Sequence, residues 1–233
     1  MTNKTINRPG FGVIAWRLAV KDFWLIRWPL VGYAAMGALA LLFISINHPL
    51  TFHAGLVLMV SALAVVGAHL VFASMMHERT NQTLPFLLSL PISYLQYTWS
   101  KLLFTIGTFS LFWLALVLGI FAVVNTRDFL LAGMLPYDMI VLTYLALAFV
   151  LTLTVGMMTE SLAWTIVIMS ICNIGISLFM ITMTKFPGLG EFLGEPEAVW
   201  NTTAIGILAI EVILIVALVG LTILVQSRKT DFL

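Results

Sequence analysis

The sequence predicts an all-α integral membrane protein with six transmembrane helices, and its composition and length carry that prediction. Of its 233 residues, 61% are hydrophobic and only 9% are charged, and the mean hydropathy is +1.09. Soluble domains contain about 45–50% apolar and about 25% charged residues. A helix that crosses a hydrocarbon core of about 30 Å needs about 20 apolar residues. Six such helices with short connections fill a chain of this length, which leaves no room for a catalytic soluble domain.

Six apolar stretches define the predicted spans, and each is bounded by charged residues, Pro, Gly or Asn. They occupy residues 28–46, 52–76, 102–124, 139–158, 162–184 and 203–225. The fourth is the least certain span, because Thr143, Thr152 and Thr154 dilute its apolar run. Only a few residues connect spans one and two, or spans four and five, so each of these pairs is expected to be antiparallel neighbours. We expect one six-span domain over residues 28–233, preceded by a cytoplasmic segment over residues 1–27.

The basic residues predict the orientation of the spans, because Lys and Arg concentrate on the cytoplasmic side of a membrane. Nine of the 11 Lys and Arg residues fall on one side of the predicted spans. These nine are Lys4, Arg8, Arg17, Lys21, Arg27, Arg79, Lys101, Arg228 and Lys229. Only Arg127 and Lys185 fall on the other side. We therefore expect a multi-pass protein of the cell inner (plasma) membrane with both termini in the cytoplasm.

The segment before the first span combines aromatic, aliphatic and basic residues over positions 11–28. Arg17 and Lys21 are spaced i, i+4, and charged residues interrupt the first 27 positions, which is not typical of a cleavable signal peptide. The pattern favours an amphipathic helix in the cytoplasmic interface, with its rings among the headgroups and its cations toward anionic lipid. The alternative is a first span that starts early.

The predicted cytoplasmic connection over residues 77–100 is unusually apolar for a loop. After a charged start it holds a run of Leu and Phe residues that ends at Pro91. Pro85 is tolerated in the first turn of a helix, whereas Pro91 stops one. Ser93 and Gln96 have the spacing of a capping box, so the helix of the third span is expected to begin near Ser93. The connection therefore predicts a short cytoplasmic helix lying against the membrane.

The same connection resembles the signature of ABC-2 type permeases, the transmembrane subunits of ATP-binding-cassette exporters. From residue 78 to residue 93 it reads E-R-T-N-Q-T-L-P-F-L-L-S-L-P-I-S, and Lys101 follows. The family pattern has an acidic–basic start, Gly-Thr-Leu, a Leu-Leu pair, Leu-Pro with a small hydroxyl residue, and a Lys that opens the third span. Gln82 stands where the family usually has Gly, which bears on the turn into the short helix.

The resemblance implies a permease that works with a separate ATPase subunit. Two copies of this chain, or this chain and a related permease, would enclose a pathway for an amphipathic drug, peptide or lipid-like cargo. ATP and Mg would bind only to the ATPase, and the sequence agrees, because it has no G-x-x-x-x-G-K-[ST] motif. No nucleic-acid partner is expected.

The short helix would be the coupling helix that docks on the ATPase. By the resemblance, Glu78 and Arg79 make the charged contacts, Thr83, Leu87 and Leu90 pack, and Pro91 closes the motif. Alternatively, Glu78 and Arg79 only form a solvated end of the second span.

Two further glutamates are candidate functional residues. Glu160, in the turn between spans four and five, is expected either to form a second contact with the ATPase or to favour the start of span five through the helix dipole. Glu211 lies within the sixth span, where a charged group costs about 2.5–3.5 kcal/mol on insertion scales. It would line the export pathway, or it would be a protonated carboxyl that bonds a neighbouring helix or reaches toward the outer headgroups.

Other features leave alternatives open. The outer connection over residues 185–200 would be an external gate that dips into the membrane, or a plain acidic loop. The alanines of the first span, including Ala34 and Ala38, are the expected site of part of the dimer seam. The single cysteine permits no disulfide within the chain, and the four histidines form no metal site. His69 is expected to be a packed hydrogen-bonding residue.

Two other function classes compete with the permease. An intramembrane protease or lipid-modifying enzyme would need acids, bases or ligands that converge at depth, and only Glu211 and His69 are available. An ion-coupled secondary transporter often shows broken spans and internal repeats, which this sequence lacks. We therefore expect a transport subunit without a catalytic site of its own.

Overall fold

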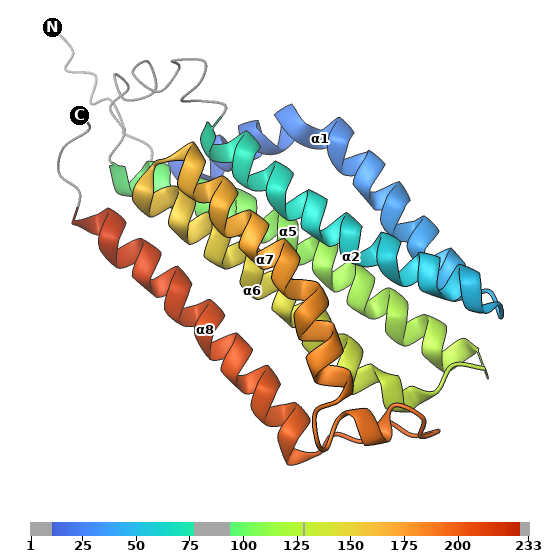
Figure 1. Cartoon of the computed structure of the whole chain (residues 1–233). Coiled ribbons are helices and arrows are strands. Elements are labelled where there is room, and N and C mark those ends of the chain that lie inside the picture. Colours follow the sequence, from blue (N-terminus) through green and yellow to red (C-terminus); the bar gives the residue numbers. More distant parts are fainter. Residues whose placement is uncertain (1–10, 77–93, 128, 229–233) are drawn as a thin grey trace, which may run out of the picture.

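A computed structural model describes residues 11–76, 94–127 and 129–228, which form long helices packed side by side in one bundle (Figure 1). The long helices are α1 (Phe11–Ile44), α2 (Pro49–Val71), α5 (Tyr94–Thr126), α6 (Leu135–Thr159), α7 (Leu162–Thr184) and α8 (Thr202–Ser227). All six are long and apolar enough to cross a membrane, as the sequence predicts. Within the described residues, the remaining elements are short helical turns.

The helices alternate in direction along the bundle (Figure 1). The start of α1, the end of α2, the start of α5 and the end of α8 lie at one end. The connections from α1 to α2, from α5 to α6 and from α7 to α8 lie at the other end. α1 packs on α2 and α6 packs on α7, which confirms the two antiparallel pairs expected from the short connections.

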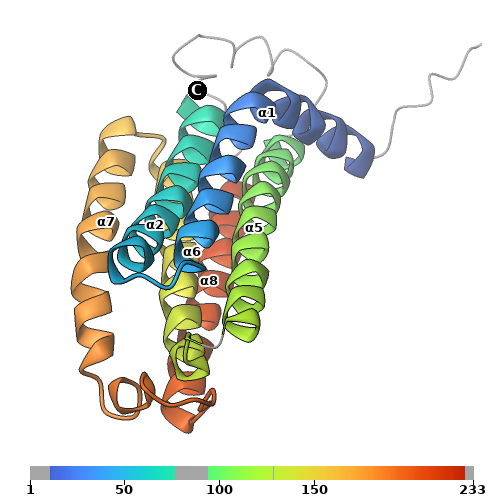
Figure 2. The ribbon, with the colours of Figure 1, turned by 90° about the vertical axis from the view of Figure 1, so that its right-hand side faces the viewer.

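α1 joins the predicted lead-in segment and the first span in one continuous helix. Figure 2 shows its first turns running across the top of the bundle, steeply inclined to the rest of the helix. Pro29 lies inside α1. Proline removes a backbone donor and bends a helix. The boundary predicted near residue 28 is therefore a bend in one helix, not a gap between two.

The most extensive helix contacts divide the bundle into two groups. α1 packs along both α2 and α5, whereas α6 packs along both α7 and α8. The span containing α6 is 61% buried over its most apolar window, against 11% for α7 and α8. The threonines that dilute this span in the sequence suit such a place, since Thr143 and Thr152 donate to backbone carbonyls of their own helix at 2.7 and 2.8 Å. The predicted span that the threonines dilute is thus the central helix.

Close packing of α1 on α2 depends on Gly55. A Cβ atom added to Gly55 would lie 2.8 Å from the carbonyl oxygen of Ala40 and 2.8 Å from the backbone nitrogen of Ile44. Backbone atoms at that distance cannot move aside without shifting the helix. The absence of a side chain at this position therefore sets how closely the two helices approach.

We expect Gly55→Ala to destabilise the protein by about 1–3 kcal/mol, because overpacking forces the backbone apart. The thermal midpoint of the purified protein in detergent measures the effect. Gly32→Ala is the matched control, since nothing lies within 4 Å of a Cβ atom built at Gly32. Equal midpoints for the two variants would contradict the close-packing argument.

Candidate functional site

The predicted coupling segment lies outside the described residues. It includes six of the candidate site residues, namely Glu78, Arg79, Thr83, Leu87, Leu90 and Pro91. Its flanks are described: α2 continues into a π-helical turn (Phe72–Met76), and α5 begins at Tyr94. π-helical turns are rare and often occur at functional sites. The segment thus leaves and re-enters the bundle at the end where α1 begins and α8 ends (Figure 1).

A buried ion pair links α1 to the first turns of α5. Lys101 Nζ lies 2.7 Å from Asp22 Oδ2, and the exposed fractions of the two side chains are 3% and 8%. Lys101 also lies 5.4 Å from the ring centre of Tyr97, and Lys21 lies 3.3 Å from the other oxygen of Asp22. The pair fixes the inclined start of α1 against α5.

Sequence analysis singled out Lys101 but missed Asp22. The sequence did contain a sign of this ion pair, because Asp22 is the only acidic residue in a lead-in segment whose other charged residues are cations. A carboxylate in an apolar helix requires a cation or a donor at contact distance. Its partner is 79 positions away in the sequence, so only the tertiary structure identifies it.

We expect Lys101→Met to lower stability by about 3–5 kcal/mol, because removing one partner leaves a buried charge uncompensated. Adding Asp22→Asn to that variant is expected to recover part of the loss. Thermal unfolding in detergent provides the readout. Lys21→Met serves as the control, since the Lys21 side chain is 52% exposed. If Lys21→Met and Lys101→Met destabilise the protein equally, the buried pair is not a stabilising contact.

Glu160 ends α6 and does not belong to the first turn of α7. Its backbone is left-handed, with φ 57° and ψ 18°, and its amide donates to the carbonyl of Gly156. Ser161 follows as the N-cap of α7, whose first turn contains no acidic residue. Glu160 is therefore not in the first turn of α7, where the helix-dipole explanation placed it. Glu160 lies in the connection at the same end of the bundle as the start of α5 (Figure 1).

Glu211 belongs to the face of α8 that packs on α6. The buried residues of α8 are Ala204, Glu211, Thr222 and Gln226. The hydroxyls of Thr222 and Thr154 are 3.0 Å apart, and the Gln226 amide donates to the Met157 carbonyl at 2.5 Å. These contacts hold α8 against α6, and Glu211 is buried on the same face of α8.

The carboxyl group of Glu211 has no hydrogen bond to any residue that the structure describes. Glu211 is 5% exposed, and both of its carboxyl oxygens are buried without a partner. The hydrogen bond to a neighbouring helix, one of the alternatives for Glu211, is therefore not found in the described part of the chain. The hydroxyl of Tyr144 on α6 does not bond Glu211 but donates to the Cys172 carbonyl at 3.4 Å.

We expect Glu211→Met to change stability by less than about 1.5 kcal/mol, because the substitution conserves volume and breaks no hydrogen bond. Gln226→Met, on the same face of α8, removes the bond to Met157 and is expected to cost about 1–3 kcal/mol. Thermal midpoints of the two variants in detergent test the comparison. A larger loss at Glu211 would mean that its carboxyl has a partner.

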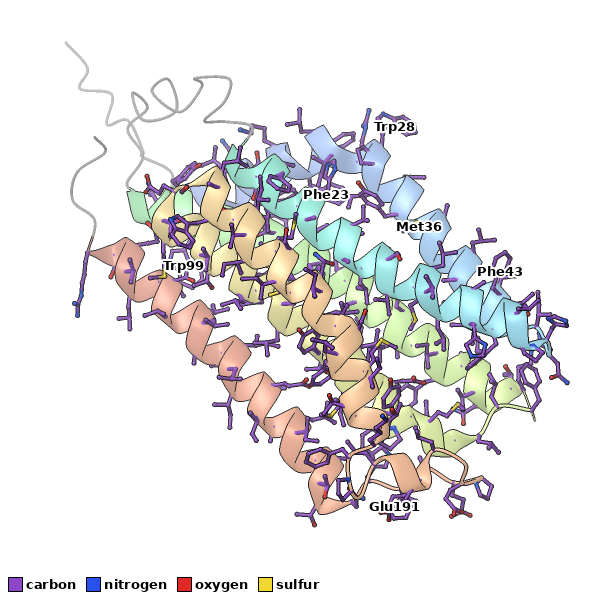
Figure 3. All side chains as sticks on the ribbon, viewed as in Figure 1. Phe23, Trp28, Met36, Phe43, Trp99 and Glu191 are labelled. Atoms are coloured by element: carbon purple, nitrogen blue, oxygen red, sulfur yellow. The ribbon has the colours of Figure 1, made fainter. Side chains whose placement is uncertain are left out.

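The outer connection is held against the end of the bundle. Leu189 is 4% exposed and packs with Ile140, Met183 and Ala204. The Gly133 amide donates to the carbonyl of Glu195 at 3.0 Å, and Asn201 caps α8. The three glutamates of the connection are exposed, and Figure 3 shows Glu191 at the opposite end of the bundle from Trp99. The connection is therefore folded onto α6, with its acidic groups outward.

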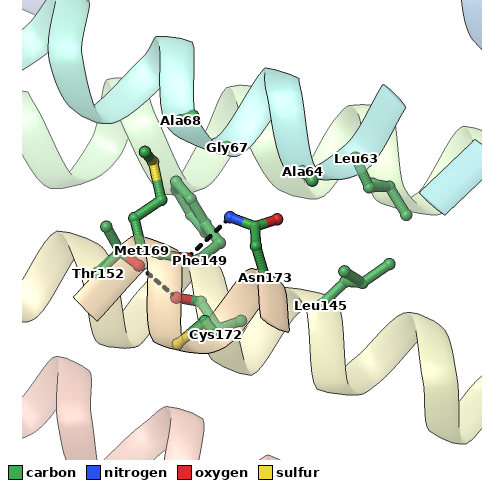
Figure 4. Close-up of a pocket in the computed structure, with 11 residues that line it drawn as sticks. Leu63, Ala64, Gly67, Ala68, Leu145, Phe149, Thr152, Met169, Cys172 and Asn173 are labelled. Carbon is green, nitrogen blue, oxygen red and sulfur yellow. Dashed lines mark hydrogen bonds between the residues drawn. The ribbon is translucent and has the colours of Figure 1, made fainter. Parts of the chain in front are cut away.

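A cleft separates α2 from α7, and α6 forms its floor (Figure 4). Small residues of α2, including Ala64, Gly67 and Ala68, line one wall. Met169 and Asn173 of α7 line the other. Most of its lining is apolar, and Thr152 and Asn173 contribute polar side chains, with the Asn173 amide pointing into the cleft (Figure 4).

His69 pairs with Tyr33 of α1, since its Nδ1 lies 3.0 Å from the Tyr33 hydroxyl. This is the packed hydrogen-bonding role expected from the sequence. Within the described ranges, no three His, Cys, Asp or Glu residues are grouped as metal ligands would be.

Comparison with known proteins gives no relative. The chain matches no family model, no curated protein and no solved structure.

Proposed function

We propose that this chain is the permease subunit of an ABC-2 type exporter, and that residues 78–93 couple it to a separate ATPase subunit. The motif in those residues carries the proposal, because it combines a charged pair, a Leu-Leu pair and Leu-Pro in a connection between two apolar helices. The bundle would form half of a pathway for an amphipathic drug, peptide or lipid-like molecule. A second copy, or a related permease, would supply the other half.

The distribution of basic residues supports a cytoplasmic position for this motif. Arg17, Lys21 and Arg27 on α1, Lys101 on α5 and Arg228 after α8 all belong to the end of the bundle from which the segment leaves. The opposite end holds Arg127 and Lys185. Lys and Arg favour the cytoplasmic side of an inner membrane, and an ATPase can reach only that side.

The inclined start of α1 fits a helix lying in the cytoplasmic interface. Trp16 and Trp24 are 63% and 60% exposed, so their rings are free to sit among lipid headgroups. The Arg27 guanidinium lies 4.5 Å from the ring centre of Trp24. Such an arrangement keeps the cation near the membrane surface while the rings contact lipid.

The contacts of the bundle suggest how movement of the segment would reach the pathway. Residues 77–93 join α2 to α5, and both helices pack along α1. The Asp22–Lys101 pair ties α1 to α5 close to the point where the segment ends. Closure of two ATPase subunits on ATP would displace the segment. α1, α2 and α5 would then tilt together relative to α6, α7 and α8. In this scheme Glu160 supplies a second contact with the ATPase.

An intramembrane enzyme is the weaker alternative. Acid–base catalysis needs its groups to converge on one substrate position. His69 faces α1 through Tyr33, whereas Glu211 lies between α8 and α6. The two ionisable groups therefore belong to different helix contacts.

We expect Glu78→Lys to abolish stimulation of an ATPase encoded beside this chain, because the reversed charge would repel its docking groove. Membrane insertion should be unchanged. The measurements are co-purification of the two subunits and ATPase activity of the reconstituted pair. Glu191→Lys is the control, since it makes the same change at the other end of the bundle (Figure 3). If both variants stimulate the ATPase normally, the coupling role of Glu78 is wrong.

A further inference from the structure

α7 carries a row of exposed polar residues in the middle of its membrane-spanning length. Ser170, Asn173 and Ser177 are spaced i, i+3 and i+7, so they share one face of the helix. All three are exposed. The helix has a mean hydropathy of 2.2 over its span, and its other exposed large residues are apolar. The row is therefore an exception that packing among the described residues does not explain.

The face of α7 that holds the helix in the bundle is a different one. Thr165, Ile176 and Met183 are the buried residues of α7. Tyr144 of α6 reaches this side, since its hydroxyl contacts the Cys172 carbonyl and its ring stacks on Phe179. The polar row lies on another side of α7, where the described residues bury neither Ser170 nor Ser177 and Asn173 borders the cleft.

The polar row has hydrogen-bonding capacity that hydrocarbon cannot satisfy. Asn173 donates one N–H to the Met169 carbonyl of its own helix at 2.8 Å. Its second N–H and its carbonyl oxygen bond no described residue, and the hydroxyls of Ser170 and Ser177 bond no described side chain. Lipid tails have neither donors nor acceptors, so such groups in spanning helices bond across helix contacts.

A cleft between α7 and α2 lies beside this row. Asn173 points into the cleft, opposite Ala64 and Gly67 of α2 (Figure 4). Small residues allow two helix backbones to approach closely. Ser61, one turn from Ala64 on α2, is also exposed.

We propose that Ser170, Asn173 and Ser177 form the surface through which two copies of this chain associate, with Asn173 of each copy beside the two-fold axis. A primary amide is both donor and acceptor, and a hydroxyl is too, so this row complements an identical row. It carries no charge that would require a partner of opposite sign. The inference rests on the dimer that the proposed function includes, and it replaces the alanines of the first span as the seam. Ala34 and Ala38 are exposed but offer no hydrogen bonds.

Cysteine cross-linking in native membranes tests this surface directly. Single cysteines at positions 170, 173 and 177 are introduced into a Cys172→Ser background and oxidised with copper phenanthroline. Ile171→Cys is the matched control, because Ile171 lies at the same depth, is 59% exposed and points to another side of α7. Ala38→Cys reports on the first-span seam.

We expect disulfide-linked dimers at positions 170, 173 and 177, strongest at 173, and none at 171 or 38. Asn173→Leu should weaken dimerisation in detergent by up to about tenfold, whereas Asn173→Gln should retain it. Cross-links at 38 alone, or equal yields at 171 and 173, would overturn the proposal. So would labelling of the 173 thiol by a membrane-impermeant reagent without any cross-link, because the row would then face water.

This experiment needs no ATPase, so its result is separate from that of the coupling test. If an ATPase co-purifies but no cross-links form on α7, the proposed permease function stands and the proposed dimer surface is rejected. Cross-links on α7 without any ATPase partner would keep the seam and reject the permease.

Discussion

Packing on α6 is the interaction on which the rest of the bundle depends. α6 is the most buried of the six long helices, and it contacts α2, α5, α7 and α8. α7 packs almost entirely on α6, and α8 packs mainly on it. α7 is therefore held almost entirely by one neighbour and α8 mainly by one, and most of their surface is left for lipid or for another chain.

A few polar contacts join neighbouring helices of the bundle. The Asp22–Lys101 pair joins α1 to α5, Tyr33 and His69 join α1 to α2, and Thr154 meets Thr222 between α6 and α8. Apolar side chains gain little free energy when they move from lipid into a contact between helices, since lipid tails are equally apolar. Hydrogen bonds and close contacts at small residues then decide which faces meet.

These contacts give the proposed transport cycle a structural basis. A segment attached to α2 and α5 would act on a three-helix group that α1 holds together. The other group, built on α6, carries both the unpartnered carboxyl of Glu211 and the polar row of α7. One group would thus receive the movement, and the other would form the contact with the second copy.

The number of spans and the antiparallel neighbours could be predicted from the sequence by itself, because hydropathy and loop length are properties of short stretches of chain. The hydrogen-bonding role of His69 could be predicted too, because a lone histidine inside an apolar span needs a polar partner. The sequence also supplied the motif at residues 78–93, the basis of the proposed function. The tertiary structure alone decided that the threonine-rich fourth span is central, that Asp22 is the partner of Lys101, and that α1 is one bent helix. It also placed Glu160 at the end of α6 and not in the first turn of α7. These features depend on which helix faces contact each other. A contact between residues 79 positions apart, such as Asp22 and Lys101, produces no pattern in the local sequence.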